Sequence, residues 1–271
     1  MKTTIKTLLA TLGLASTLAL TGCGEKEASV QDNSKITVGV MAGEEAQVAE
    51  YAVQEAKKLG LEVKLITFTD YVSPNAALAD GSVDVNAFQH KPYLDAQIKD
   101  RGYEFAIAGN TFVYPIAAYS YKLDSVADLP EGGKIAVPNN PSNLGRSLVL
   151  LEQQGIIKLK EGSGINATKL DIVENPKNVE IIELETPQLP RSLEDVDIAI
   201  INNTFAAGVG LTPSKDGLFV EDKESPYVNL IVARKDNVDA ENVKTFVKAY
   251  QTDAVYNAAM EVFDGAVVKG W

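Results

Sequence analysis

The feature that most constrains this fold is a β-α-β-α-β order of segments that occurs twice along the chain. In each copy, short apolar runs alternate with segments whose apolar residues recur every three or four positions, as in an amphipathic helix. The expected strands are 35–40, 61–68 and 83–88 in the first copy and 134–137, 179–184 and 197–201 in the second. Such alternation is typical of parallel sheets covered by helices. Two copies predict two α/β lobes, although a single sheet would also accommodate this order.

Two segments are placed to connect the lobes. An apolar and aromatic run over 103–121 carries the chain to the second lobe, and a strand over 227–234 carries it back. The expected boundaries are 35–114 for the first segment of lobe 1, 115–229 for lobe 2 and 230–271 for the return to lobe 1. Ligands of such folds bind where strand ends and helix N-termini converge. We therefore expect a ligand cleft between the lobes.

The first residues have the pattern of a bacterial targeting segment. Residues 1–22 combine a basic start with an apolar run that is too short to span a bilayer comfortably. Residues 20–23 (LTGC) resemble a lipobox, by which cleavage would leave Cys23 as an acylated N-terminus that anchors the protein to a membrane. The polar residues 23–34 are expected to form a flexible tether. The alternative is a secretory signal with an incidental cysteine.

Charge and cysteine content restrict the partners. The chain has 25 basic and 37 acidic residues and a formal net charge of −12. An acidic surface disfavours nucleic acid and anionic lipid as partners, but it does not restrict a small zwitterion, whose recognition is local. Cys23 is the single cysteine, so no disulfide forms within the chain. We expect the free protein to be a monomer.

The stretch 138–148 (PNNPSNLGRSL) joins a strand of the second copy to a helix. Ser142 or Asn143 can cap this helix, and Gly145 lets the backbone approach a bound group. Free N–H groups at a helix N-terminus favour an anion, and Arg146 adds a forked cation in the first turn. The stretch therefore predicts a cradle for the carboxylate of a small molecule. An ordinary capped helix with a surface arginine is the alternative.

Aromatic and amide side chains follow the strands that end at the expected cleft. Those of lobe 1 and the first crossover are Tyr71, Phe88, His90, Tyr93 and Tyr114. The second lobe offers Asn143, Asn202 and Asn203, and Asn229 lies in the returning crossover. Aromatic rings at strand exits favour an apolar box with polar rims. Buried amides can accept from an ammonium group through oxygen and donate to a carboxylate through nitrogen. The alternatives are core packing for the rings and turn or cap roles for the amides.

The sequence offers little support for an enzyme. His90 is the single histidine and no cysteine remains free, so we expect neither a metal site nor a resident cofactor. The sequence has no Gly-x-Ser-x-Gly turn, no Gly-x-x-x-x-Gly-Lys phosphate loop and no Gly-x-Gly-x-x-Gly helix start. An acid-dyad hydrolase is conceivable because acids are abundant, but for the same reason chance pairing means little. We therefore predict a binding protein.

Several blocks of the sequence resemble the methionine-binding lipoproteins of the MetQ/NlpA group. They are NAFQHKPYLD, GNTFVYPIAAYS, IAVPNNPSNLGRSL, DIVENPKN, ETPQLPRSL, GLTPSKDG and FVEDKESPYVNLIVAR, and the resemblance runs from about residue 35 to 271 and includes the lipobox. It implies a two-lobed type II periplasmic-binding-protein fold and an envelope lipoprotein, facing the periplasm or the cell exterior. It also implies that the protein delivers methionine to an ABC importer made of a permease and an ATPase.

The resemblance also assigns expected roles to site residues. By matching motif positions, the side-chain pocket would be lined by Tyr71, Phe88, His90 and Tyr93. The amino-acid group would be held by Asn143, Arg146, Asn202 and Asn229. Two alternatives stay open, namely a receptor for another amino acid or a short peptide, and an envelope lipoprotein that acts through protein contacts.

Overall fold

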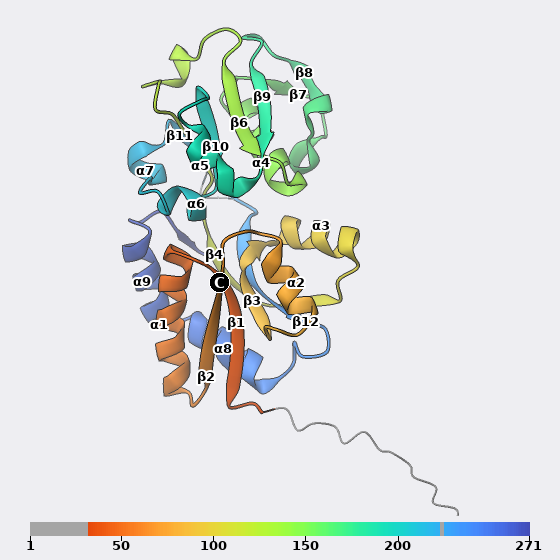
Figure 1. Cartoon of the computed structure of the whole chain (residues 1–271), viewed down its shortest axis with the longest axis vertical. Helices are drawn as coiled ribbons and strands as arrows, with labels where there is room; N and C mark the ends of the chain where they lie inside the picture. The colour runs from red at the N-terminus through yellow and green to blue at the C-terminus, as the bar shows by residue number, and fades with distance from the viewer. Residues whose placement is uncertain (1–31, 223–224) are drawn as a thin grey trace, which may run out of the picture. The chain divides into compact units, whose positions relative to one another are not determined.

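The computed structural model describes residues 32–222 and 225–271 (Figure 1). The predicted targeting segment, the lipobox with Cys23 and most of the predicted tether lie outside the described residues. Within the described part of the chain, no helix is both long and apolar enough to cross a membrane. The described residues contain two main sheets, and each forms the centre of one lobe.

Lobe 1 is built on a six-stranded sheet in the order β13-β4-β12-β3-β1-β2. The strands are β1 (Lys35–Met41), β2 (Glu62–Phe68), β3 (Val85–His90), β4 (Phe105–Val113), β12 (Val228–Arg234) and β13 (Val268–Lys269). β1 pairs in parallel with β2 and β3, whereas β12 runs antiparallel between β3 and β4. The returning segment of the chain therefore lies inside this sheet, and it ties the C-terminal residues to lobe 1.

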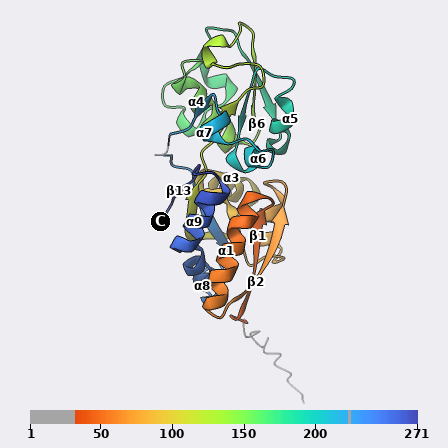
Figure 2. The same cartoon turned by 90° about the vertical axis from the view of Figure 1, so that its left-hand side faces the viewer.

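Helices cover both faces of the lobe 1 sheet. They are α1 (Glu44–Lys58), α2 (Ser73–Ala79), α3 (Lys91–Arg101), α8 (Glu241–Tyr250) and α9 (Asp253–Val262). In β12, Ile231 and Ala233 join the core under α1, α8 and α9, and the intervening Leu230 and Val232 join the core under α2 and α3. This alternation follows from the two-residue period of a strand. Figure 2 shows α1, α8 and α9 side by side on one side of the lobe.

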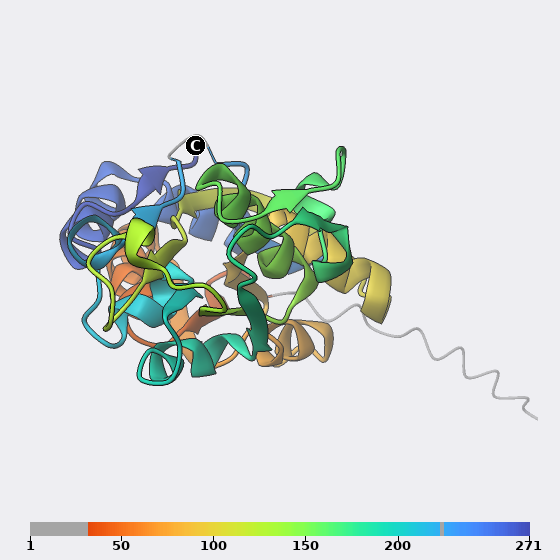
Figure 3. The same cartoon turned by 90° about the horizontal axis from the view of Figure 1, so that it is seen from above.

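Lobe 2 is built on a five-stranded sheet in the order β11-β5-β10-β6-β9. The strands are β5 (Ala117–Tyr119), β6 (Lys134–Pro138), β9 (Glu180–Leu184), β10 (Ile198–Ile201) and β11 (Phe219–Val220). Its helices are α4 (Pro141–Gln153), α5 (Leu189–Ser192), α6 (Asn203–Ala207) and α7 (Pro213–Asp216), and a hairpin of β7 (Lys158–Leu159) and β8 (Ile172–Glu174) extends it. Figure 3 looks down on this lobe, whose segments are green and teal.

The predicted duplication is confirmed as two sheets rather than one. In lobe 1, β1 lies between β2 and β3, and in lobe 2, β6 lies between β9 and β10, all in parallel. Each copy therefore repeats the same strand order, with its first strand in the middle. As a result, the C-terminal ends of β3 and β10 and the N-termini of the helices that follow them come close to one cleft, where the site is found.

Candidate functional site

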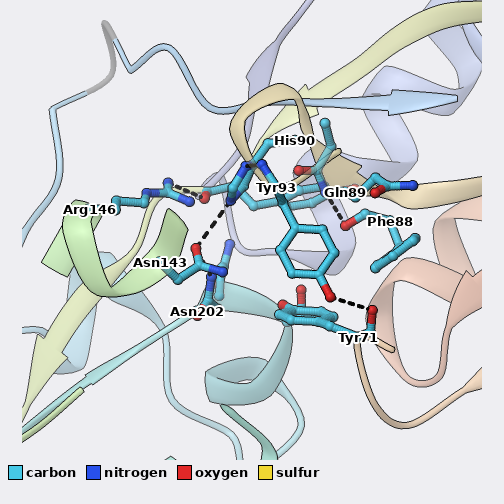
Figure 4. Close-up of a pocket in the computed structure, with 12 residues that line it drawn as sticks. Tyr71, Phe88, Gln89, His90, Tyr93, Asn143, Arg146 and Asn202 are labelled. Atoms are coloured by element: carbon cyan, nitrogen blue, oxygen red, sulfur yellow. Dashed lines mark hydrogen bonds between the residues drawn. The ribbon is translucent and has the colours of Figure 1, made fainter. Parts of the chain in front are cut away.

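A small cavity lies between the lobes (Figure 4). Its free volume is about 20 Å³, which is room for about one water molecule, so its walls have to move apart to admit a ligand. The residues that we predicted to contact a ligand all lie in its walls: Tyr71, Phe88, His90, Tyr93, Asn143, Arg146, Asn202 and Asn229. Tyr114 and Asn203 line it as well, together with Gln89 and Thr204, which the sequence pattern did not single out. The tertiary structure thus brings these side chains together, and their contacts with a ligand stay predictions.

One end of the cavity is aromatic. The ring centroids of Tyr71 and Phe88 lie 5.8 Å apart, and those of Phe88 and Tyr93 lie 6.0 Å apart. Phe205 of α6 contacts Tyr71 edge-on at 5.0 Å, and Met41 packs against this group. The Tyr93 hydroxyl donates to the Tyr71 carbonyl oxygen over 2.7 Å, which holds the two residues together. This end therefore offers ring faces and edges to an uncharged group.

His90 connects the aromatic end to the opposite lobe. It is the N-cap of α3, where its Nδ1 accepts from the backbone N–H of Tyr93 over 3.2 Å. Because that N–H can only donate, the neutral imidazole carries its proton on Nε2, which lies 3.1 Å from Asn143 Oδ1. Burial, assisted by the positive charge of Arg146, lowers the pKa of His90 to about 3. The side chain is therefore a neutral hydrogen-bond donor to lobe 2.

The helix that carries Arg146 begins earlier than the sequence suggested. α4 starts at Pro141, and its N-cap is Asn140, whose Oδ1 accepts from the backbone N–H of Asn143 over 3.1 Å. Our prediction of Ser142 or Asn143 as the cap is wrong. Pro141 has no N–H to satisfy and fits the first helical position. The cap is therefore Asn140, the residue before it. Arg146 consequently lies in the second turn of α4 rather than in the first.

Gly145 serves a packing role that differs from the predicted one. A Cβ atom at this position would overlap the carbonyl oxygen of Ile165. The backbone that approaches Gly145 closely is therefore that of the short helix η2 (Gly164–Asn166), and not a bound group. This contact presses η2 against α4, the helix that carries Arg146.

Arg146 is buried and already has an acidic partner. Its Nε donates to Glu221 Oε1 over 2.8 Å, and its Nη2 donates both to Glu221 Oε2 and to the Tyr114 carbonyl oxygen. The guanidinium carbon also lies 4.2 Å from the centre of the Tyr227 ring. Glu221 was not foreseen as a partner, because 75 positions separate the two residues and no local pattern links them. We expected the positive charge of Arg146 to face only a ligand. Glu221 instead holds the guanidinium in place and partly balances its charge.

The amides of the cavity are oriented by bonds to one another and to the backbone. Asn143 Oδ1 accepts from Asn202 Nδ2 over 3.1 Å, in addition to its bond with His90. Asn229 Nδ2 donates to the Phe88 carbonyl oxygen over 3.0 Å. Asn202 Oδ1 is buried and has no hydrogen-bond partner among the described residues. The cavity wall therefore contains at least one acceptor that the described residues leave unsatisfied.

Two further contacts join the lobes beside the cavity. Thr204 of α6 donates its hydroxyl to Oε1 of Glu45 in the first turn of α1, and Asn203 Nδ2 donates to the Ala266 carbonyl oxygen over 3.1 Å. Burial raises the pKa of Glu45 to about 8, so this carboxyl group is mainly protonated at neutral pH. No sequence signal singles out Glu45, because an acidic residue in the first turn of a helix is ordinary. Together these contacts hold the lobes in a closed arrangement.

Gln89 belongs to a buried amide cluster behind the cavity. Its Nε2 donates to Asn75 Oδ1 over 2.7 Å and its Oε1 accepts from Asn75 Nδ2 over 2.9 Å, while Asn86 joins the same group. These bonds occupy the side-chain amide of Gln89 and stabilise β3 from the side of α2, the helix that carries Asn75. The polar residues within a wholly buried strand are a sequence signal that could have revealed this cluster.

No group of three histidine, cysteine, aspartate or glutamate side chains in the described ranges could hold a metal ion. The site instead combines one paired cation, several neutral amides and a set of aromatic rings. Such a combination is chemically suited to a small polar molecule with an apolar tail.

A two-lobed α/β fold with a polar and aromatic cavity between its lobes is the architecture of the periplasmic substrate-binding proteins, and the solved structures of such proteins share it. The family model described as NlpA lipoprotein matches residues 36–271. The chain belongs to the NlpA lipoprotein family. A probable D-methionine-binding lipoprotein MetQ from Vibrio cholerae is 64% identical over 272 residues, and the match covers 100% of both chains.

Solved structures agree with this assignment. The crystal structure of the methionine binding protein MetQ superposes with a TM-score of 0.87 at 63% identity and covers 89% of this chain and 99% of that chain. A nutrient binding protein from Burkholderia cenocepacia bound to methionine superposes with a TM-score of 0.85 at 50% identity, and the match covers 87% of this chain and 100% of that chain. An ABC transporter periplasmic substrate-binding protein from Coxiella burnetii superposes with a TM-score of 0.85 at 48% identity, and the match again covers 87% of this chain and 100% of that chain.

Proposed function

We propose that this chain is a solute-binding lipoprotein that captures methionine between its lobes and delivers it to an ABC importer. The observation that carries the proposal is the division of one buried cavity into a polar end, built around Arg146, and an aromatic end, built around Phe88 and Tyr93. Methionine has the same division, with a zwitterionic group at one end and an uncharged thioether at the other. The names of the related proteins support the same ligand.

The polar end would hold the carboxylate and the ammonium group separately. Among the described residues, the bonds of Arg146 use Nε and Nη2, so Nη1 is the donor that we assign to the carboxylate. Asn202 Oδ1 has no partner in the described chain, and Asn229 uses only its Nδ2 on the backbone. These two amide oxygens are the acceptors that we assign to the ammonium group.

The aromatic end would enclose the thioether. Tyr71, Phe88 and Tyr93 surround it with ring edges and faces, and sulfur contacts with aromatic rings are favourable by roughly 0.3–1.5 kcal/mol each. The phenols of Tyr71 and Tyr93 are neutral at physiological pH, and burial raises the pKa of each further above its usual range. A lysine or glutamate side chain would lose its hydration here without gaining a partner of opposite charge.

The remaining parts of the proposal concern the lobes, the anchor and the transporter. We assign lobe 1 to residues 35–114 and 230–271 and lobe 2 to residues 115–229, except that Val228 and Asn229 already belong to β12 of the lobe 1 sheet. An acylated Cys23 would anchor the protein to a membrane of the cell envelope. Residues 24–34 would act as a flexible tether between this anchor and the folded lobes. The closed lobes would then present one continuous face to a permease that is driven by its ATPase.

Calorimetry with purified protein tests the ligand assignment. We expect L- or D-methionine to bind and to raise the melting temperature, and we expect lysine and glutamate to do neither. Tighter binding of a different amino acid or a short peptide would replace methionine as the ligand. Absence of any ligand-induced thermal shift across the panel would instead favour a lipoprotein that acts through protein contacts.

A further inference from the structure

A chain of hydrogen bonds crosses the cleft from the start of α3 to the start of α6. It runs from the Tyr93 backbone N–H to His90 Nδ1, and from His90 Nε2 to Asn143 Oδ1. It ends with Asn202, whose Nδ2 also points at Asn143 Oδ1. Figure 4 shows His90, Asn143 and Asn202 in sequence along one side of the cavity.

The direction of every bond in this chain is fixed by its first member. A backbone N–H only donates, so His90 Nδ1 must accept and the proton of the neutral ring must lie on Nε2. Asn143 must then present oxygen to His90, and its own Nδ2 donates to Asn140 Oδ1 over 2.9 Å, which fixes the same orientation from the other side. Asn202 therefore has to turn its NH₂ group toward Asn143.

These fixed bond directions leave one acceptor without a partner at the Asn202 end of the hydrogen-bond chain. With Nδ2 of Asn202 directed at Asn143, its Oδ1 is left buried in the cavity wall without a partner among the described residues. A buried acceptor without a donor costs free energy. A ligand group that donates hydrogen bonds, such as an ammonium group, removes that cost, whereas a carboxylate at the same place would increase it.

We propose that His90 is a positioning residue for the amino group of the ligand, because its Nε2–H sets the orientation of Asn143 and Asn202 so that an amide oxygen faces the ammonium. The proposal rests on the proposed function and adds a role for His90 that differs from lining the side-chain pocket. His90 acts through Asn202, and its single imidazole couples helix α3 of lobe 1 to helices α4 and α6 of lobe 2.

The variant His90→Asn separates positioning from helix capping. Asparagine is a good N-cap and can accept from the Tyr93 N–H, but it is too short to replace the Nε2 donor. Calorimetry compares methionine with 4-(methylthio)butanoate, which lacks the amino group. We expect the variant to lose roughly ten- to a hundredfold in affinity for methionine and to bind the analogue nearly as the wild type does.

The Asn202→Ala variant and the double variant test whether His90 acts through Asn202. We expect Asn202→Ala to reduce the preference for methionine over the analogue, and His90→Asn to add little in that background. Equal weakening of both ligands by His90→Asn would show a merely structural role and would overturn the proposal, as would unchanged affinities. If the wild-type protein binds neither ligand, the proposed function itself fails.

Nitrogen-15 spectroscopy tests the tautomer independently of affinity. The chain has one histidine, so its ring signals need no assignment. The groups that face the ring are the guanidinium of Arg146 and the phenols of Tyr93 and Tyr227, and none of them carries a negative charge at neutral pH. In the methionine complex we expect the neutral Nε2–H form from pH 8 to pH 5, and an Nδ1–H form or an ordinary titration would overturn the proposal.

Discussion

At the scale of single residues, the pairing of Arg146 with Glu221 governs both stability and recognition. The side chain of Arg146 is 3% exposed and that of Glu221 is 12% exposed. Taking two charges out of water is costly, and the pair tolerates burial because its oxygens and nitrogens meet in a forked geometry. Replacing Arg146 alone therefore has two effects. It removes the proposed ligand contact, and it leaves the Glu221 carboxylate buried without its cation.

We expect Arg146→Ala to destabilise the protein by about 3–5 kcal/mol, because it leaves a buried carboxylate unpaired. The double variant Arg146→Met with Glu221→Gln removes both charges and should fold with a smaller loss of stability. Both variants should bind methionine roughly ten- to a hundredfold more weakly, which corresponds to the loss of one charge-assisted bond.

Calorimetric unfolding and titration distinguish the two effects. Comparison of Arg146→Ala with the double variant separates loss of fold from loss of ligand contact. Wild-type affinity in a well-folded double variant would remove Arg146 from the ligand site and would contradict the assignment of Nη1 to the carboxylate.

At the scale of elements, helix N-termini carry most of the site. The first residues of α3, α4 and α6 face the same cavity, and each follows a strand of a sheet. At α4, the Asn140 Oδ1 holds both the backbone N–H and the side-chain amide of Asn143. The cap of this helix is thus also a support for the site.

We expect Asn140→Ala to cost about 1 kcal/mol of stability through loss of the cap and also to weaken methionine binding, because Asn143 loses its support. Thr252→Ala is the matched control. Thr252 caps α9 by accepting from the Val255 N–H over 3.3 Å, and it does not line the cavity. The control should lose similar stability in chemical denaturation but keep its affinity. Equal affinities of the two variants would show that the Asn140 cap serves the helix alone.

The contact of α1 with α6 couples lobe closure to pH. The pKa of Glu45 is about 8 in the closed arrangement, where burial raises it, and it should fall toward the ordinary value near 4.5 as separation of the lobes exposes the carboxyl group to water. At pH values between 4.5 and 8, Glu45 is protonated in the closed form and ionised in the open form. The contribution of Glu45 to the stability of the closed form is therefore complete below pH 4.5 and is lost as the pH rises to about 8.

We therefore expect methionine binding to take up protons at pH 6 to 7. Titration calorimetry in buffers of different ionisation enthalpy measures this uptake. Glu45→Gln keeps a hydrogen-bonding side chain without a proton to gain, and the uptake should vanish in this variant. Uptake that persists unchanged in Glu45→Gln would assign it to another group.

At the scale of the whole molecule, few of the hydrogen bonds and ion pairs among the described residues cross from one lobe to the other. Besides the contacts of His90, Glu45 and Asn203, an exposed ion pair joins Lys215 to Asp264, and such pairs contribute little. A ligand shifts the equilibrium between open and closed forms only by its difference in affinity for them. Methionine would contact both lobes only when they are closed.

We expect methionine to reduce the radius of gyration of the protein in solution. Small-angle X-ray scattering with and without the ligand measures this change, and the double variant of Arg146 and Glu221 serves as the control that should respond weakly. Superimposable scattering curves for the wild type would mean that the lobes are closed in the absence of ligand and would contradict a closure driven by methionine.

The strands and helices could be predicted because their signals are local. The apolar runs at 35–40 and 134–137 and the helical spacing after them gave the two copies of the fold. The site residues could be selected because side chains at strand ends and helix N-termini share one edge of each sheet. Errors arose where two local signals competed, as at Asn140 and Ser142, which are both good caps.

The sequence by itself determined the two-copy architecture and the chemical character of the site, because hydrophobic period, turn residues and residue type act over a few positions. Only the tertiary structure decided the partners of those residues. Glu221 reaches Arg146 across 75 positions and Thr204 reaches Glu45 across 159, and no periodicity encodes contacts at such separations. The physical reason is that burial and the direction of hydrogen bonds depend on which elements pack together, and this packing is fixed only when both sheets have formed.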